Sequence, residues 1–262
     1  MQWVRFLQDG QPEWGQLHDG MIQAVAGSPL VVGACPPRPG MERLPLASTP
    51  LLPPCEPTKI VCVGRNYRDH ARELGNDVPD PAKSEPLLFL KPPSSLLAPG
   101  GVIELPPLSK QVEYEGELGV VIRRRCRKSV PGEDIRRYIL GLTCVNDVTA
   151  RDLQRSDPQW TRAKGFDTFC PVGPAVVDLD SGIGWDELEL ETRVNGEVRQ
   201  RGNTRDFLYS LERIFAAITA VMTLEPGDLI ATGTPAGVGL LRPGDRVSVS
   251  IAGVGVLENT VA

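Results

Sequence analysis

Short alternations of apolar and polar residues, broken by turn signals, run through much of the chain. Residues 3–25 alternate weakly with the period of a half-buried strand. Residues 246–261 have the same character around Gly253, so we expect them to fold back on themselves. Tight-turn signals lie at Asp9-Gly10, Asp19-Gly20 and Asn195-Gly196. The pattern predicts several short hairpins and a chain built mainly of strands.

Apolar runs predict buried strands elsewhere, at residues 59–63, 86–90, 112–122 and 138–145. Residues 211–222 instead carry apolar side chains at the helical period and predict an amphipathic helix. The polar segment 66–74, which stops at Gly75, predicts a second helix. Residues 149–154 predict a helical turn with Thr149 and Asp152 as its capping box. The predicted fold class is α+β, mainly β.

Composition and charge narrow the functional class. The chain has 262 residues, of which 41% are hydrophobic and 23% charged, as in an ordinary soluble globular protein. Its formal net charge of −5 argues against a nucleic-acid partner, which would need a basic surface. Prolines cluster between residues 36 and 57. This segment predicts a small β-rich N-terminal unit with a proline-rich linker at 1–57 and a main domain at 58–262.

Cysteine usage and hydropathy bear on the compartment. No apolar run approaches the roughly 20 residues of a membrane-spanning helix. The first ten residues lack the apolar stretch of a secretory signal. The six cysteines contain no C-x-x-C pair, so we expect reduced, mostly buried thiols. These features predict a cytoplasmic protein with no membrane partner.

Three glutamates alternate along the predicted strand 112–122, at Glu113, Glu115 and Glu117. Residues two apart on a strand point the same way, so these carboxylates repel unless water screens them, one is protonated or a cation lies among them. Asp147 ends another apolar strand and adds a carboxylate. Such an all-oxygen set suits Mg²⁺, Mn²⁺ or Ca²⁺ rather than zinc. The alternatives are a solvated strand face and, for Asp147, a capping role.

Three further motifs are candidates for chemistry. On a helix, His70 and Glu73 share one face, where the carboxylate would orient the imidazole as a general base; the alternative is a surface salt bridge. Lys164 lies between apolar residues and either binds an anion or enolate or is an ordinary surface lysine. The loop 232–239 is glycine-rich but lacks the lysine of a phosphate loop. It predicts either backbone N–H groups lining a small-anion pocket or a plain turn.

Taken together, these motifs resemble the fumarylacetoacetate hydrolase family. In the family's order, they are the Y-E-x-E-L strand at 114–118, Asp147, the W-T-x-A-K context of Lys164 and the T-G-T-P-x-G-V-G loop at 232–239. Gly64-Arg-Asn-Tyr67, His70, Glu73 and the stretch 88–92 resemble the branch of acylpyruvate hydrolases and oxaloacetate decarboxylases. The N-terminal unit is similar to that of bacterial isomerases and decarboxylases of the homoprotocatechuate pathway.

The resemblance implies a mixed β-roll or pseudo-barrel with a packed helix, and a homodimer. It implies Mg²⁺ or Mn²⁺, with Ca²⁺ accepted in vitro. Glu113 departs from the family, where many relatives have histidine or aspartate, so it is not counted as a ligand. The implied metal ligands are Glu115, Glu117 and Asp147, the catalytic residues His70, Glu73 and Lys164, and the substrate-binding candidates Arg65, Lys91, Gln154 and Thr234.

The implied activity is metal-dependent hydrolysis of the C–C bond of a small acylpyruvate-type 2,4-dioxo acid, with His70 activating water. One alternative is decarboxylation of oxaloacetate or of 5-oxopent-3-ene-1,2,5-tricarboxylate. Another is isomerisation of 2-hydroxyhepta-2,4-diene-1,7-dioate or tautomerisation of oxaloacetate. A non-catalytic binding module that keeps the fold is the remaining alternative. The substrate in each catalytic case is a small 2-keto or 2,4-dioxo acid.

Overall fold

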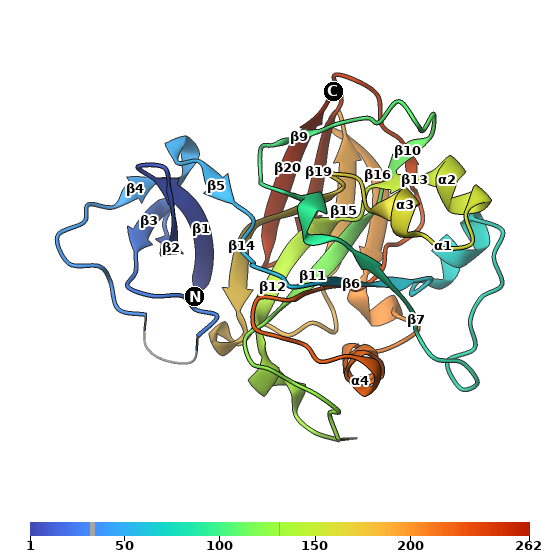
Figure 1. Ribbon diagram of the computed structural model, residues 1–262, viewed down its shortest axis with the longest axis horizontal. Helices are drawn as coiled ribbons and strands as arrows, with labels where there is room; N and C mark the ends of the chain where they lie inside the picture. The colour runs from blue at the N-terminus through green and yellow to red at the C-terminus, as the bar shows by residue number, and fades with distance from the viewer. Residues whose placement is uncertain (32–34, 131) are drawn as a thin grey trace.

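The computed structural model describes residues 1–31, 35–130 and 132–262. Its N-terminal unit, blue in Figure 1, is a small meander beside the main domain. Both aspartate–glycine turns have positive φ at each residue, the conformation that joins two adjacent strands tightly, so the predicted hairpins are confirmed. The strands are β1 (Gln2–Gln8), β2 (Gln11–His18), β3 (Met21–Ala24), β4 (Leu44–Pro45) and β5 (Leu51–Leu52).

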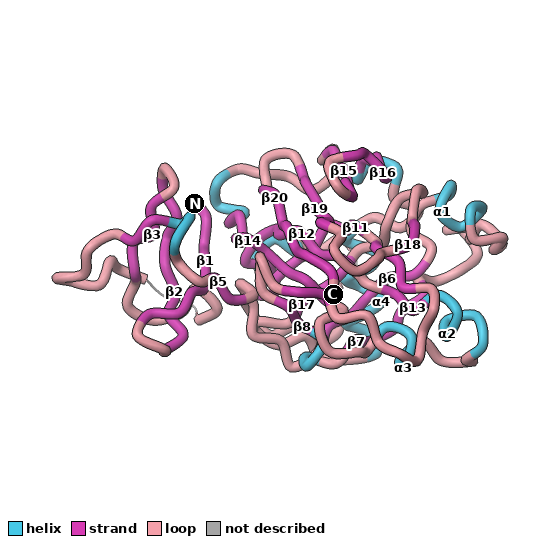
Figure 2. The backbone as a smooth tube through the Cα atoms, turned by 90° about the horizontal axis from the view of Figure 1, so that it is seen from above, coloured by secondary structure: helices cyan, strands magenta, loops and turns pink. Residues whose placement is uncertain are grey.

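The largest sheet runs through both parts of the chain, in the order β4-β3-β2-β1-β14-β12-β11-β17-β6-β7. Figure 2 shows β1 meeting the main domain at β14, with which it pairs antiparallel. Because the pairing of β1 with β14 joins the two predicted parts in one sheet, the structure does not separate them. The domain boundary after residue 57 stays a prediction. The added strands are β6 (Ile60–Gly64), β7 (Leu87–Lys91), β11 (Gly116–Ile122), β12 (Ile139–Asn146), β14 (Cys170–Asp178) and β17 (Leu229–Ala231), while β8 (Leu96–Leu97) pairs with β14.

Two smaller sheets complete the main domain. One contains β9 (Val102–Ile103), β15 (Glu189–Val194), β16 (Glu197–Asn203), β19 (Arg246–Ile251) and β20 (Gly255–Val261). The other contains β10 (Val112–Tyr114), β13 (Thr149–Ala150) and β18 (Gly239–Leu240). Parallel pairing of β6 with β17 and of β8 with β14, among antiparallel pairs, makes the large sheet mixed. The mainly β fold with mixed sheets is therefore confirmed.

Helices are few and short. They are α1 (Arg68–Glu73), α2 (Arg151–Ser156), α3 (Thr161–Lys164) and α4 (Leu211–Val221), with 3₁₀ turns at Leu46–Ser48, Pro93–Ser95, Ile135–Tyr138, Leu179–Ser181 and Thr204–Asp206. The amphipathic helix predicted at 211–222 is α4, whose apolar stripe packs into the core beside β11. In Figure 1, α1, α2 and α3 gather at the side of the main domain opposite the N-terminal unit. Among the described helices, none has the length and apolar character needed to cross a membrane.

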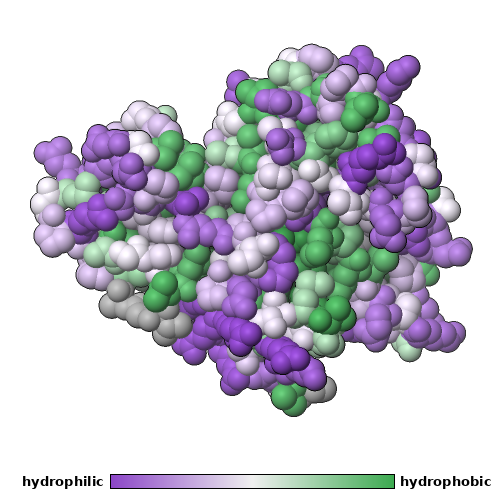
Figure 3. Space-filling view, viewed as in Figure 1, coloured by the Kyte–Doolittle hydropathy of each residue, from purple (hydrophilic) through white to green (hydrophobic). Residues whose placement is uncertain are grey.

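The core lies between the large sheet and the sheet of β15, β19 and β20. Leu118, Val120 and Ile122 of β11 point into it, while Val121 of the same strand packs in a second cluster. In Figure 3, hydrophilic side chains cover most of the periphery of one face, and a notch separates the N-terminal unit from the main domain. The six cysteines are free thiols, and all except the half-buried Cys35 are buried, as predicted.

Three local predictions differ from the structure. The predicted strand 112–122 is two strands, β10 and β11, because the chain changes sheets at Glu115. The first helix begins at Arg68 rather than 66, because Tyr67 is extended and bridges to Phe207. The capping box at 149–154 is wrong. The Thr149 hydroxyl donates to the Asp147 carbonyl, and Asp152 accepts from Ser109 and Lys110.

Candidate metal centre and active-site cavity

Three buried carboxylates meet where β11 and β12 lie side by side. Glu115 precedes β11, Glu117 lies within it, and Asp147 follows β12. Antiparallel pairing sets Glu117 opposite Val145, and the Asp147 amide donates to the Glu115 carbonyl at 2.8 Å. One oxygen from each side chain lies within 4.8 Å of the others. Residues thirty positions apart therefore converge because the register of two strands is fixed by their backbone hydrogen bonds.

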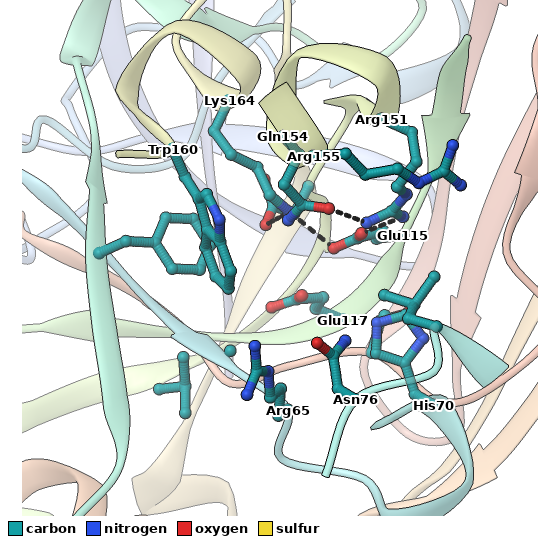
Figure 4. Close-up of a pocket in the computed structure, with 16 residues that line it drawn as sticks. Arg65, His70, Asn76, Glu115, Glu117, Arg151, Gln154, Arg155, Trp160 and Lys164 are labelled. Atoms are coloured by element: carbon teal, nitrogen blue, oxygen red, sulfur yellow. Dashed lines mark hydrogen bonds and ion pairs between the residues drawn. The ribbon is translucent and has the colours of Figure 1, made fainter. Parts of the chain in front are cut away.

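Buried cations surround two of these carboxylates. The Lys164 ammonium donates to Glu115 Oε2 at 2.8 Å and to Asp147 Oδ2 at 2.6 Å, as Figure 4 shows for Glu115. Arg151 Nη2 donates to the other Glu115 oxygen at 2.5 Å, and Lys91 Nζ to Asp147 Oδ1 at 2.6 Å. Burial alone would raise the pKa of Glu115, but the charges of Lys164 and Arg151 outweigh it and hold that pKa well below its usual range.

Glu117 is in a different electrostatic environment. Its Oε2 accepts from the Gly233 amide at 2.7 Å, and it forms no ion pair with any residue that the structure describes. Burial, with the charges of Asp147 and Glu115 added, raises its pKa well above the usual range. A divalent cation would remove this repulsion. Each oxygen of Glu115 and Asp147 keeps a second lone pair, so the three side chains fit Mg²⁺, Mn²⁺ or Ca²⁺.

His70 and Glu73 form the predicted pair on α1. His70 is buried, and its Nδ1 lies 3.3 Å from Glu73 Oε2. Glu73 also accepts from the Gly237 amide at 3.0 and 3.2 Å. Burial opposes ionisation of Glu73, but the hydrogen bonds from His70 and Gly237 together lower its pKa. With Nδ1–H directed at this carboxylate, Nε2 of His70 is left as a proton acceptor.

A cavity of about 180 Å³ opens over the triad. One wall is apolar, with the Phe89 and Trp160 rings 5.1 Å apart in an edge-to-face arrangement. Charged and polar side chains complete it, as Figure 4 shows. The lining residues are Val63, Gly64, Arg65, His70, Leu74, Asn76, Phe89, Glu115, Glu117, Asp147, Arg151, Gln154, Arg155, Trp160, Lys164 and Thr234. The cavity is sized for a small ligand with polar ends.

Arg65 is the unusual cation of this cavity. It is a non-glycine residue in the left-handed region, with a φ of 59°. Asn66 holds that conformation, since its side chain donates to the Thr232 carbonyl and accepts from the Tyr209 amide, both at 2.8 Å. The Arg65 Nε is buried without a hydrogen-bond partner, and no acidic side chain of the described residues pairs with its guanidinium. Its charge is therefore available to a ligand.

The structure brings most of the predicted site residues together. Arg65, Gln154 and Thr234 line the cavity with the triad, His70 and Lys164. Lys91 does not reach it, because its ammonium lies behind Asp147 and donates to that side chain and to the Val148 carbonyl. In the loop 232–239, the amides of Gly233 and Gly237 donate to the chain's own carboxylates, Glu117 and Glu73.

Sequence reasoning missed Arg151, which contacts the site residues Glu115 and Gln154 and the neighbouring Glu113. Its Nε donates to Glu113 at 2.8 Å, while Nη1 and Nη2 donate to Gln154 and Glu115. The sequence could have indicated its contact with Gln154, since Arg151 stands three residues before Gln154 on the predicted helical turn, where side chains at this spacing share a face. Phe89, Trp160 and Arg155 were also missed, and their positions in the cavity depend on how α2, α3 and β7 pack together.

Comparisons with known proteins agree with this geometry. A family model described as fumarylacetoacetate (FAA) hydrolase C-terminal matches residues 59–262, and one described as Rv2993c-like, N-terminal, matches residues 1–54. An uncharacterized protein of Archaeoglobus fulgidus is 50% identical over 246 residues, covering 94% of this chain and 92% of that protein.

Among the similar proteins are some with functional names. The oxaloacetate tautomerase YisK of Bacillus subtilis is 40% identical over 215 residues, covering 79% of this chain and 70% of that protein. The crystal structure of 2-hydroxyhepta-2,4-diene-1,7-dioate isomerase from Mycobacterium marinum superimposes with a TM-score of 0.88 at 39% identity, covering 100% of this chain and 98% of that one. The resemblance drawn from the sequence motifs and the fold it implied are thus confirmed. With its buried acidic triad, this chain belongs to the fumarylacetoacetate hydrolase family of enzymes.

Proposed function

We propose that the protein catalyses metal-dependent keto–enol tautomerisation of a small 2-oxo diacid of the oxaloacetate class. The observation that carries the proposal is Arg65, a cation without an acidic partner among the described residues, in the same cavity as the triad. A substrate that binds at the triad through its 2-oxo acid end would place a second carboxylate within reach of this guanidinium. An acylpyruvate with an apolar tail offers Arg65 no partner.

The named relatives support the same choice. A tautomerase of oxaloacetate and an isomerase of a dienedioate both act on diacids, and both move a proton without hydrolysing a bond. They favour the tautomerase and isomerase alternatives over the acylpyruvate hydrolysis that the sequence motifs first suggested.

The site residues can perform this proton transfer. When bound, a divalent cation on Glu115, Glu117 and Asp147 would supply Lewis-acid polarisation of the 2-oxo acid. His70 Nε2, aligned through Glu73, takes a proton from the carbon beside the keto group. The C–H electron pair forms the carbon–carbon double bond, and the carbonyl π pair moves to oxygen. The oxygen takes up a proton from solvent to give the enol, and His70 releases its proton to solvent.

Two polar side chains are set to hold the oxygens of the substrate. Lys164 uses two of its three N–H donors on Glu115 and Asp147, so the third remains for the developing enolate. Gln154 accepts from Arg151 through Oε1, which leaves its amide N–H groups to donate into the cavity.

The test is a substrate panel on the full chain with Mg²⁺, Mn²⁺ or EDTA. Oxaloacetate, acetylpyruvate and 2-hydroxyhepta-2,4-diene-1,7-dioate are followed by enol absorbance and by product analysis for pyruvate, acetate and CO₂. We expect accelerated keto–enol equilibration of oxaloacetate, lost in EDTA, without pyruvate formation. Cleavage of acetylpyruvate, with oxaloacetate equilibrating at the uncatalysed rate, would instead establish the hydrolase. Absence of turnover and of any thermal shift with metal would indicate a binding module.

Arg65→Met tests the diacid assignment directly. Hydrogen bonds to a charged group contribute about 1.5–3 kcal/mol, so KM for oxaloacetate should rise about 10–100-fold. Arg68→Met is the matched control, because Arg68 is an exposed arginine on α1 outside the cavity lining. Equal KM values in the two variants would refute a role for Arg65 in binding the distal carboxylate.

A further inference from the structure

Glu113 is a buried carboxylate that lies beside the triad without joining it. It belongs to β10, its side chain is 8% exposed, and the three-carboxylate group does not include it. Its Oε2 accepts from Arg151 Nε at 2.8 Å, and its Oε1 accepts from Gln111 Nε2 at 2.7 Å. Both oxygens are therefore engaged by the protein itself.

Arg151 connects this carboxylate to the metal centre. Its side chain is 1% exposed, and its guanidinium divides three donors among Glu113, Glu115 and Gln154. Figure 4 shows Arg151 between Glu115 and Gln154. A single planar group thus fixes the orientation of a triad carboxylate and of a cavity amide, and Glu113 holds the remaining edge of that group.

The network continues to the cavity mouth. Gln111 Oε1 accepts from Arg155 Nη1 at 2.9 Å, and the exposed Arg155 also lines the cavity. Glu113 therefore stands between two cavity arginines, directly bonded to Arg151 and joined to Arg155 through Gln111. No element of this chain of contacts depends on the identity of the substrate.

We propose that Glu113 is a positioning residue for the metal centre. It balances part of the Arg151 charge, so that Glu115 is shared between Arg151 and a bound cation rather than neutralised by Arg151 alone. It also adds a negative charge close to the triad, which favours a divalent cation. Replacing a group that hydrogen-bonds a metal ligand, as Arg151 does for Glu115, typically changes metal affinity about 10–100-fold, and Glu113 acts one contact further out through Arg151.

The test uses Glu113→Gln in the full chain, titrated calorimetrically with Mg²⁺ or Mn²⁺ and without substrate. This variant keeps the shape and one acceptor oxygen but removes the charge. We expect metal affinity to fall about 10-fold, the lower end of the range for direct partners of metal ligands, and Glu113→Asp, which restores the charge, to recover most of it. The matched control is Asp178→Asn. Asp178 is a buried carboxylate paired with Arg123 outside the cavity lining, so its loss should lower Tm and leave metal affinity unchanged.

Two results would overturn the proposal: metal affinity in Glu113→Gln within twofold of the unaltered chain, or a loss no larger than in Asp178→Asn. If Glu113→Gln does not fold, the half-buried Gln111→Ala variant decides, because it removes the hydrogen bond that holds the Glu113 carboxylate in place against Arg151. Weaker metal binding in that variant supports the proposal, and unchanged binding overturns it. Since no substrate is present, the outcome is independent of the tautomerase assignment.

Discussion

Lys91→Met isolates the electrostatic balance beneath the metal centre. The Lys91 side chain is 0% exposed, Asp147 is 1% exposed, and their ion pair measures 2.6 Å. Removing one partner of a buried pair costs about 3–5 kcal/mol, because the other charge stays buried. Lys164 still contacts Asp147, so we take the lower value, about 3 kcal/mol. For a chain of this size that corresponds to a fall in Tm of about 6–12 °C.

A divalent cation should reverse much of this loss. With Lys91 absent, Asp147 presents more negative charge to the cation, so Mg²⁺ should bind more tightly and stabilise the variant more than the unaltered chain. The assay is thermal unfolding in EDTA and in excess Mg²⁺. The Tm gap between Lys91→Met and the unaltered chain should be large in EDTA and smaller in Mg²⁺.

Lys59→Met provides the matched control. Lys59 pairs with the fully buried Asp228, which does not belong to the triad. Its loss should lower Tm by the same amount in EDTA and in Mg²⁺. A Lys91→Met gap that is equally unaffected by Mg²⁺ would refute the assignment of Asp147 as a metal ligand.

Three further predictions follow from the same geometry. His70→Ala should reduce kcat about 100- to 10,000-fold, the range typical for loss of a general base. The thermal shift with Mg²⁺ should stay unchanged, because His70 is outside the triad. Without metal, Glu117 has a raised pKa in the folded state. Its contribution to stability is therefore full below the ordinary carboxyl pKa of about 4.3 and is lost as pH rises through the raised pKa. Tm measured against pH in EDTA should fall over that pH range, and Mg²⁺ should suppress the fall. Gly116→Ala would place a Cβ 2.1 Å from Thr192 Oγ1, so chemical denaturation should show a loss of about 1–3 kcal/mol.

Local chemistry explains which parts of the fold were predictable. The Asn195-Gly196 turn follows from positive φ at both residues, a property of the pair itself. Helix α4 follows from the helical spacing of its own apolar residues. The break at Glu115 did not follow, because it depends on Asn146, whose side chain accepts from the Glu115 amide, and on Gln200, which accepts from the Gly116 amide. Both partners are distant in sequence and invisible to a local pattern.

The site divides in the same way. The triad could be predicted from the sequence, because Glu115 and Glu117 repeat with the period of a strand and Asp147 ends a second predicted strand. The order of the family motifs then identified His70 and Lys164. Arg151 was missed because its significance lies mainly in its contacts with Glu113 and Glu115, which belong to a distant part of the sequence. Thr149 and Asp152 were given a capping role that tertiary contacts override, since Asp152 bonds to Ser109, more than forty residues earlier.

The triad by itself does not choose the reaction. A cation bound to three carboxylates and a buried lysine would favour an enolate in tautomerisation, in decarboxylation and in C–C cleavage alike. What differs among these reactions is the group at the far end of the substrate and the target of the base. In this chain the cavity offers a substrate Arg65 and the aromatic pair Phe89 and Trp160, and we propose His70 as the base. We therefore expect selection among the three reactions to depend on Arg65 at the end of β6, on β7 and on the α1–α3 region, whereas the triad would supply the chemistry they share.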